Sequence, residues 1–132
     1  MKSYDDVYKT PGAFSWSELI TSDPEAASKF YSQLFGWQIE AGDTGGQPYN
    51  HIKVGETSIG GIMGKPPGAP ADMPSMWGCY VTVANLDETV AAVKRLGGSV
   101  LMESMEVKSV GRMAVIGDPQ GAALSVIQYI GD

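Results

Sequence analysis

Residues 22–37, SDPEAASKFYSQLFGW, carry one complete helix signal and decide how the rest of the chain is read. Asp23 can cap the first turn, and Pro24 has the fixed φ that suits the first helical position. Gly36 is placed to end the helix in a left-handed conformation. The helical spacing of the apolar residues predicts one face packed on a core, made of Ala27, Phe30, Tyr31 and Leu34.

Short strands are expected on both sides of this helix. One strand, residues 14–21, precedes it, and three follow at residues 37–41, 47–54 and 57–64. Within the last of these strands, Gly60-Gly61 predicts a bulge or a close approach of neighbouring chains.

The same order of elements returns after a segment rich in proline, glycine and alanine. Asn85 is expected to cap the second helix, with Glu88 three residues later completing the pattern. The expected strands of this half lie at residues 77–84, 99–102, 110–117 and 122–129. We therefore expect one domain over residues 1–132, with a βαβββ unit at 12–64, a connector at 65–75 and a second βαβββ unit at 76–129.

An internal repeat relates the two halves without a gap. An offset of 62 residues, the separation of Asp23 and Asn85, superimposes the two helix caps. The same offset superimposes Gly36 on Gly98, near the two helix ends. A repeated βαβββ unit with mixed sheets places the chain in the α+β class.

Two motifs at the ends of the repeat are typical of a known family. Residues 22–37 are similar to the opening pattern Asp-Pro-x-x-Ala, Phe-Tyr, Leu-Phe-Gly-Trp, and residues 111–122 to the ending Gly-Arg, Asp-Pro-x-Gly-Ala. In both, the sequence resembles the vicinal oxygen chelate superfamily of glyoxalases, bleomycin resistance proteins and dioxygenases. The resemblance implies two curved four-stranded sheets around a concave cavity for a small molecule. It also implies that chains pair, so a homodimer is expected.

Metal-dependent members of this family hold a divalent ion with four His, Glu or Gln side chains on the concave surface. The resemblance places two of these positions in the first strands of the units, at Trp16 and Gly78. It places the other two in the last strands, at Met63 and Ser125. None of the four is a usual ligand for a divalent metal, and the chain has one histidine. We therefore expect no metal cofactor.

One unusual metal site, or a catalytic role, stays open for Glu18 and His51. Strand alternation puts Glu18 on the same face as Trp16, and His51 on the cavity or solvent side of its strand. Together they could hold a metal or transfer protons, because a carboxyl group in a desolvated pocket can act as a general acid or base. A lone histidine is, however, more often an ordinary surface or hydrogen-bonded residue than a ligand.

Without a metal, the expected cavity is apolar and aromatic with a few polar groups, as small-molecule sites commonly are. Trp16 and Tyr80 suit stacking on a flat ligand. Arg112 is a candidate for an anionic ligand group, or else it holds the neighbouring turn or a partner chain. Trp77 and Cys79 are expected to face the second helix, with Cys79 a small buried residue. The predicted ligand-binding residues are Trp16, Glu18, Met63, Tyr80, Arg112 and Ser125.

The charge and composition exclude several classes of partner. The 132 residues include 15 acidic and 9 basic ones, a net charge of -6. Nucleic acids and anionic membrane surfaces are poor partners, because phosphate binding needs clustered Lys and Arg. The single cysteine excludes a disulfide within the chain. The polar N-terminus and the lack of a long apolar run predict a cytoplasmic protein.

Three functions are compatible with these observations. The favoured one is a metal-free binding protein that sequesters a flat or hydrophobic small molecule. The second is an enzyme of the lyase, isomerase or dioxygenase type that uses Glu18 and His51 for proton transfer. The third is a structural module that acts by dimerising. The sequence does not identify the ligand, because this scaffold carries many chemistries.

Overall fold

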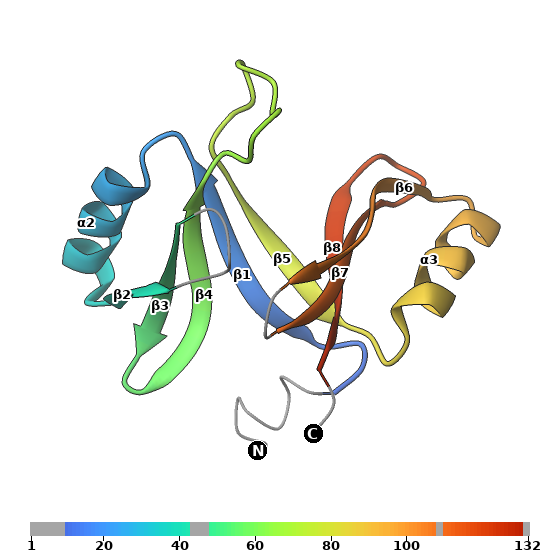
Figure 1. Ribbon diagram of the computed structural model, residues 1–132, viewed down its shortest axis with the longest axis horizontal. Coiled ribbons are helices and arrows are strands. Elements are labelled where there is room, and N and C mark those ends of the chain that lie inside the picture. The colour runs from blue at the N-terminus through green and yellow to red at the C-terminus, as the bar shows by residue number, and fades with distance from the viewer. Residues whose placement is uncertain (1–9, 43–47, 108–109, 131–132) are drawn as a thin grey trace. The chain divides into compact units, whose positions relative to one another are not determined.

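A computed structural model describes residues 10–42, 48–107 and 110–130 (Figure 1). The chain forms two compact units. Residues 16–78 make the first unit, and the described residues from Cys79 onward, together with residues 10–15, make the second. Each unit packs one helix on one face of a mixed four-stranded sheet, which confirms the α+β class and the repeated βαβββ order. Neither helix of the described part is long and apolar enough to cross a membrane.

The sheet of the first unit has the strand order β2-β3-β4-β1. β1 runs parallel to β4, whereas β3 is antiparallel to both β2 and β4. The turn at Gly55, which has a φ of 61°, joins β3 to β4. The elements are β1 (Phe14–Thr21), α2 (Pro24–Phe35), β2 (Gln38–Gly42), β3 (Tyr49–Val54) and β4 (Thr57–Gly64).

The bounds of α2 follow from its capping residues, as predicted. The Asp23 carboxylate accepts a hydrogen bond from the Ala26 N–H at 3.0 Å, which satisfies a free donor of the first turn. At the other end, Gly36 has a φ of 75° and donates its N–H to the Ser32 carbonyl at 2.8 Å. Helix α2 therefore begins and ends at the capping residues that the sequence predicted.

Fewer residues of α2 reach the core of the first unit than its apolar stripe predicted. Leu19, Ile52 and Ile62 form it, and α2 contributes only Ala27 and Tyr31. The expectation that Phe30 and Leu34 face the core is wrong: they are 58% and 56% exposed. Helix α2 packs mainly on β2 and β4, and part of its apolar face stays exposed.

The Gly60-Gly61 pair lies where neighbouring chains come close, as predicted. A Cβ atom on Gly60 would overlap the backbone oxygen of Ser17, and one on Gly61 would overlap the Tyr49 ring. The β3–β4 register also shifts between Ile52 and Lys53, which is a local bulge. Only glycine at both positions allows the observed packing.

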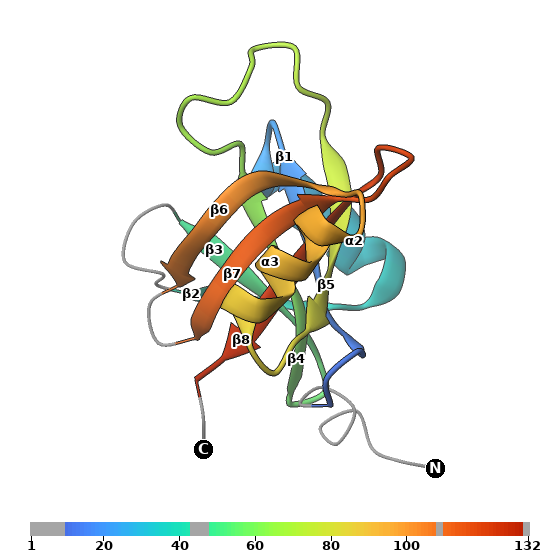
Figure 2. The same cartoon turned by 90° about the vertical axis from the view of Figure 1, so that its right-hand side faces the viewer.

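The second unit repeats this arrangement with the strand order β5-β8-β7-β6, and its helix packs against β6, β7 and β8 (Figure 2). β5 runs parallel to β8, and the other pairs are antiparallel. Asn85 caps the helix by accepting from the Glu88 N–H at 3.0 Å. Its core consists of Leu86, Ala114 and Val126. The elements are β5 (Met76–Thr82), α3 (Leu86–Arg95), β6 (Ser99–Val107), β7 (Gly111–Gly117) and β8 (Ala123–Tyr129).

Two predictions for the second half are corrected by the structure. Strand β6 extends to Val107 and not to Met102, and residues 101–106 are all exposed. At the end of the sheet order, β6 pairs on one side only, so it lacks the apolar pattern by which a strand is detected.

The second correction concerns the start of β5. Cys79 is exposed and is not the small buried residue that was expected, and pairing with β8 begins one residue later, at Tyr80. Trp77 lies instead against helix α2, where its Nε1 donates to the Tyr31 hydroxyl at 3.2 Å. The first residues of β5 therefore belong to the first unit.

Candidate functional site

The face of the first sheet that lies opposite α2 carries several polar and aromatic residues. Because Leu19, Ile52 and Ile62 pack toward α2, strand alternation turns their neighbours to the opposite face. Cross-strand register aligns Glu18 with Gly61, Gly61 with His51, and His51 with Glu40. We call this surface the helix-free face; it includes Trp16, Glu18, Ile20, Tyr49, His51, Lys53, Gly61 and Met63.

Tyr49 is the centre of a hydrogen-bond chain on the helix-free face. Its hydroxyl accepts from Trp16 Nε1 at 2.8 Å and donates to Glu18 Oε2 at 2.7 Å. The ring lies over Gly61, where any side chain would displace it, and Tyr49 is only 9% exposed. The structure thus joins the predicted residues Trp16 and Glu18 through a tyrosine that the sequence analysis did not single out as a ligand-binding or catalytic residue.

His51 packs against this chain through its ring. Its imidazole makes edge contacts with the Trp16 ring, at a centroid distance of 6.1 Å, and with the Tyr49 ring, at 5.3 Å. Gly42 leaves room for it, since a Cβ there would meet the imidazole. Its Nδ1 is buried and has no hydrogen-bond partner among the described residues. His51 therefore acts here mainly as a packed ring.

Glu18 and His51 are not arranged as a shared metal site. The strand carrying Gly61 lies between them, so their backbones are about 10 Å apart at ordinary strand spacing. The Tyr49 ring fills the space over that strand. In the described part of the chain, no three His, Cys, Asp or Glu side chains are grouped so that they could hold an ion.

Strand register changes one of the positions inferred for family metal ligands. In the second unit Ser125 pairs with Tyr80, and in the first unit the equivalent of Tyr80 is Glu18, which pairs with Gly61. The last strands are thus related by 64 residues, the separation of Gly61 and Ser125, and not by 62. The counterpart of Ser125 is Gly61, two residues before Met63 on the same face.

The residues at the four positions that the resemblance assigns to metal ligands are not usual ligands for a divalent metal. Trp16 and Gly61 stand at these positions in the first unit, and Trp16 already donates its N–H to Tyr49. The other two positions carry Gly78 and Ser125. An indole, a hydroxymethyl group and two glycines offer no imidazole or carboxylate to a divalent cation.

In the second unit, the helix-free side of the sheet is apolar and well packed. The Tyr80 hydroxyl donates to the Met113 sulfur at 3.6 Å. Both residues are buried, as are Thr82 and Ile127 beside them. Ser125 lies next to Tyr80 in the strand register and is half-buried. Tyr80 and Ser125 thus share one face of this sheet.

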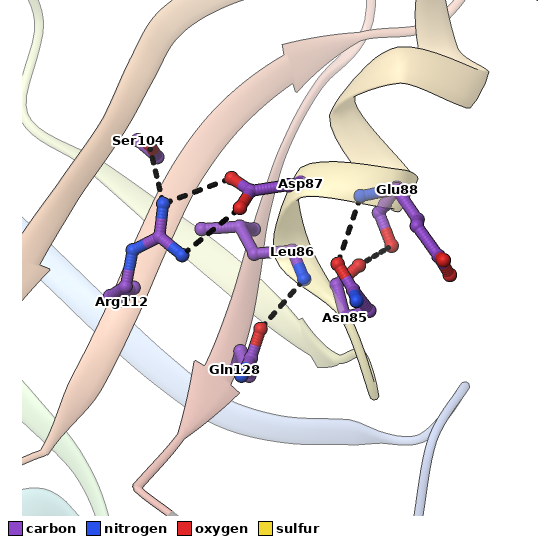
Figure 3. Close-up of polar contacts among 8 residues, drawn as sticks. Asn85, Leu86, Asp87, Glu88, Ser104, Arg112 and Gln128 are labelled. Carbon is purple, nitrogen blue, oxygen red and sulfur yellow. Dashed lines mark hydrogen bonds and ion pairs between the residues drawn. The ribbon is translucent and has the colours of Figure 1, made fainter.

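Arg112 lies on the helix side of its sheet, bound to α3 (Figure 3). One of its terminal nitrogens is 3.0 Å from Asp87 Oδ1 and 3.1 Å from the Ser104 hydroxyl. The hydrogen bond from Arg112, and then its charge, lower the pKa of Asp87, and the pKa of Arg112 is raised in return. Beside this pair, the Gln128 side chain accepts from the Leu86 N–H at 2.8 Å. These contacts fix the first turn of α3.

The chain belongs to the Glyoxalase/Bleomycin resistance protein/Dioxygenase superfamily, whose sequence profile matches residues 13–126. Solved structures with the same fold include the hypothetical protein BH1468 from Bacillus halodurans, with a TM-score of 0.72, 12% identity and coverage of 93% of this chain and 98% of that one. A methylmalonyl-CoA epimerase variant from Streptomyces coelicolor has a TM-score of 0.71, 14% identity and coverage of 92% and 100%. At these identities the likeness establishes the fold alone.

Two similar sequences carry more specific names. CFP32 of Mycobacterium tuberculosis, provisionally named a glyoxylase, is 38% identical over 119 residues, which cover 89% of this chain and 46% of CFP32. The anthracycline biosynthesis protein DauV of Streptomyces is 34% identical over 128 residues, which cover 88% of this chain and 46% of DauV. The chain thus spans about half the length of these relatives.

Proposed function

We propose that this chain is a metal-independent, small-molecule-binding member of the superfamily that holds a flat ligand against its helix-free face. The observation that carries this proposal is the position of Tyr49. Its ring covers Gly61, at a family ligand position, and its hydroxyl is bonded to Trp16, at another. This hydrogen-bond chain supports the proposal because it joins residues at positions that the resemblance assigns to metal ligands.

The chemistry of the face suits a flat and largely apolar ligand. Trp16 is half-buried, so its indole offers an aromatic surface. Met63, which pairs with Tyr49 in the strand register, adds a flexible, polarisable side chain to the same face. Two relatives are named for anthracycline biosynthesis, and anthracyclines contain a planar fused-ring system. We take Tyr80 and Ser125 as further candidates for ligand contact, because both face away from α3.

A second candidate function is an enzyme of the lyase, isomerase or dioxygenase type. It is favoured by the 2.7 Å hydrogen bond from Tyr49, which orients the Glu18 carboxylate as a proton acceptor. Loss of turnover in Glu18→Gln, with folding intact, would identify this function. A variant with full turnover, or no turnover of any substrate by the native protein, would exclude a catalytic Glu18.

We further propose that the protein is cytoplasmic and forms a homodimer. The exposed thiol of Cys79 suits a reducing compartment. The exposed apolar side chains of Phe30, Leu34 and Phe35 suit burial against a second chain.

Elemental analysis tests the metal-independent function directly. The purified protein is incubated separately with Ni, Mn, Fe, Co and Zn, desalted, and analysed for metal per chain. We expect no stoichiometric retention, because no described cluster of side chains can replace the hydration shell of these ions. Retention of one ion per chain or per dimer would contradict the proposal and would favour the enzyme.

A further inference from the structure

Resting on the homodimer proposed above, we infer that two copies of the chain pair through α2. The two α2 helices pack antiparallel about a two-fold axis, with Leu34 of each copy over Ala26 of the other and the two Phe30 rings at the axis. The partner is thus a second copy of this chain. It covers the outward face of α2 and the groove beside that face.

Three residues form a single outward ridge on α2. Ala26, Phe30 and Leu34 follow one another at intervals of four residues, and all three are exposed. Ala27 and Tyr31, each one residue further along, pack toward the core instead. Ridges of residues four apart pack into one another in the commonest class of helix–helix contact. The ridge is therefore suited to meet the same ridge of another α2.

A groove lies beside the first half of α2. Its volume is about 390 Å³, and Ala26 and Ala27 form a shallow part of its wall. On the other side, Trp77 Nε1 donates to the Tyr31 hydroxyl at 3.2 Å and the two ring centroids are 5.4 Å apart, which holds that wall in place. Its apolar lining includes Ala26, Ala27, Phe30, Tyr31, Met76 and Trp77. The groove can thus receive an aliphatic side chain.

The small and large residues of the ridge lie at opposite ends of the helix. Ala26 borders the groove in the first half of α2, whereas Leu34 is exposed near the end. An antiparallel pair with Phe30 at the axis brings Ala26 of one copy opposite Leu34 of the other, because both are four residues from Phe30. Leu34 then enters the partner's groove twice, once in each direction. A parallel pair would set leucine against leucine and leave both grooves empty.

The exposed apolar area is of the size that a dimer contact needs. Ring contacts to Tyr31 join Phe30, Phe35 and Trp77 into one surface. The exposed apolar side chains are Phe30 at 58%, Leu34 at 56%, Phe35 at 58%, Met76 at 48% and Trp77 at 41%. Since large side chains carry roughly 150–250 Å² each, these five present on the order of 500 Å². A stable interface buries about 800 Å² on each partner, so apolar side chains supply more than half of it.

Two observations favour a second copy over an unrelated partner. The face carries both the large side chain and the groove that receives it, so it is complementary to itself, as a two-fold contact requires. Relatives such as CFP32 are about twice as long as this chain, which leaves room for a second module within one polypeptide. A chain of half that length gains such a neighbour by pairing.

Exchanging the two side chains tests the contact. Sedimentation equilibrium of the full chain measures the dissociation constant of the dimer. Ala26→Leu should raise this constant at least about tenfold, because leucine then meets leucine, and Leu34→Ala should raise it as much by emptying the groove. The double variant Ala26→Leu/Leu34→Ala again pairs one large residue with one small residue, so most of the affinity should return.

A matched control separates this contact from general adhesion. Ala91→Leu changes an exposed alanine of α3 in the same way and should leave the dissociation constant unchanged. Both Ala26 and Leu34 are exposed, so circular dichroism should show an intact fold in every variant. Tighter association of Ala26→Leu would overturn the inference, because an unspecific apolar surface gains from each added apolar group. A double variant no tighter than the single ones would overturn it too.

Cysteine cross-linking determines the direction of the helices. The variants carry Cys79→Ser, because the native thiol is exposed. Oxidation of a mixture of Ala26→Cys and Leu34→Cys chains should link one kind to the other, and neither kind alone should form linked pairs. Linked pairs within one kind, or no linkage where the dimer is present, would overturn the inference and leave the homodimer standing. A native chain that stays monomeric would remove both.

Discussion

At the scale of single residues, Tyr49 joins β1, β3 and β4 through one side chain. It belongs to β3, covers a glycine of β4, and exchanges hydrogen bonds with Trp16 and Glu18 of β1. A hydrogen bond to a charged group contributes about 1.5–3 kcal/mol, and a buried group left without its partner costs a similar amount. Disturbing this residue should therefore affect stability as well as binding.

Gly61→Ala is expected to destabilise the protein by about 2–4 kcal/mol, because the new methyl group would displace the Tyr49 ring and break both of its hydrogen bonds. Urea unfolding at neutral pH measures the effect. Gly78→Ala is the matched control, since a Cβ there meets nothing within 4 Å. Equal stability of the two variants would show that Tyr49 does not need its place over Gly61.

His51→Phe distinguishes the binding protein from the enzyme. Phenylalanine keeps a ring against Trp16 and Tyr49 and removes the buried Nδ1 that lacks a partner. We expect the melting temperature to be unchanged or raised, with a gain of up to about 1 kcal/mol in the free energy of unfolding. Ligand affinity should be retained. Abolished binding or turnover in a well-folded variant would assign His51 a direct role in the site.

Which residues share the helix-free face could be predicted from the sequence, but how they contact one another could not. Strand alternation alone places Trp16 with Glu18, and Tyr49 with His51. The contact between Tyr49 and Glu18 depends on the register of β1, β4 and β3, which residues distant in sequence determine together. Gly61 was the available signal, because a glycine inside a strand indicates that something lies close to it.

At the scale of elements, Arg112 and Gln128 connect the first turn of α3 to the sheet beneath it. Asp87 and Glu88 lie in that turn, where the positive end of the helix dipole favours acids. Arg112 adds a specific partner for one of them. The ion pair is exposed, so it is expected to orient the helix more than to stabilise the whole fold.

Arg112→Gln should return the pKa of Asp87 toward its ordinary value of 3.8. A carboxyl group whose pKa is lowered on folding stabilises the protein above its unfolded pKa, and that contribution is lost as the pH falls through the folded pKa. The native protein should thus be more stable than Arg112→Gln at neutral pH. This difference in the free energy of unfolding should disappear as the pH falls below about 3.8.

Two measurements check this prediction. A carbon-detected NMR titration follows the Asp87 carboxyl group, and urea unfolding across the pH range follows stability. Arg95→Gln removes a positive charge from the other end of α3 and should leave the Asp87 titration in place. If the difference in the free energy of unfolding between the native and Arg112→Gln proteins persists unchanged to low pH, it does not arise from the pKa of Asp87.

Helix bounds could be predicted well, because Asp23, Gly36 and Asn85 encode them locally. Which residues of a helix face are exposed could not be predicted. Phe30 and Leu34 follow the spacing of buried residues, yet the sheet beneath α2 covers only part of that stripe. The length of β6 escaped prediction for the opposite reason, since an exposed edge strand imposes no apolar alternation on its sequence.

At the scale of the whole molecule, the first unit leaves a large apolar surface uncovered. A groove of about 390 Å³ beside α2 is lined in part by Phe30, Tyr31, Met76 and Trp77. Leu34 and Phe35 extend the apolar surface along the helix. Extended apolar surfaces on small proteins commonly mark interfaces, and relatives about twice as long have room for a second module.

Sedimentation velocity should therefore detect a dimer of the native chain. Leu34→Glu places a charge in the apolar surface and should weaken association by at least about tenfold. Gln33→Glu adds the same charge at the neighbouring position, which faces a more polar part of α2, and should leave the dimer intact. A native protein that stays monomeric at high concentration would contradict the homodimer.

Strand β6 has a consequence for solubility. It ends its sheet with Leu101, Met102 and Met105 exposed, which would ordinarily invite another chain to add a strand. Its pairing with β7 is interrupted twice, between Val100 and Met105, so its outer backbone groups do not form one regular ladder. Glu103 and Glu106 add repulsion between identical chains. The edge thus resists growth into fibrils, and variants that straighten it or neutralise these acids should be the ones that aggregate.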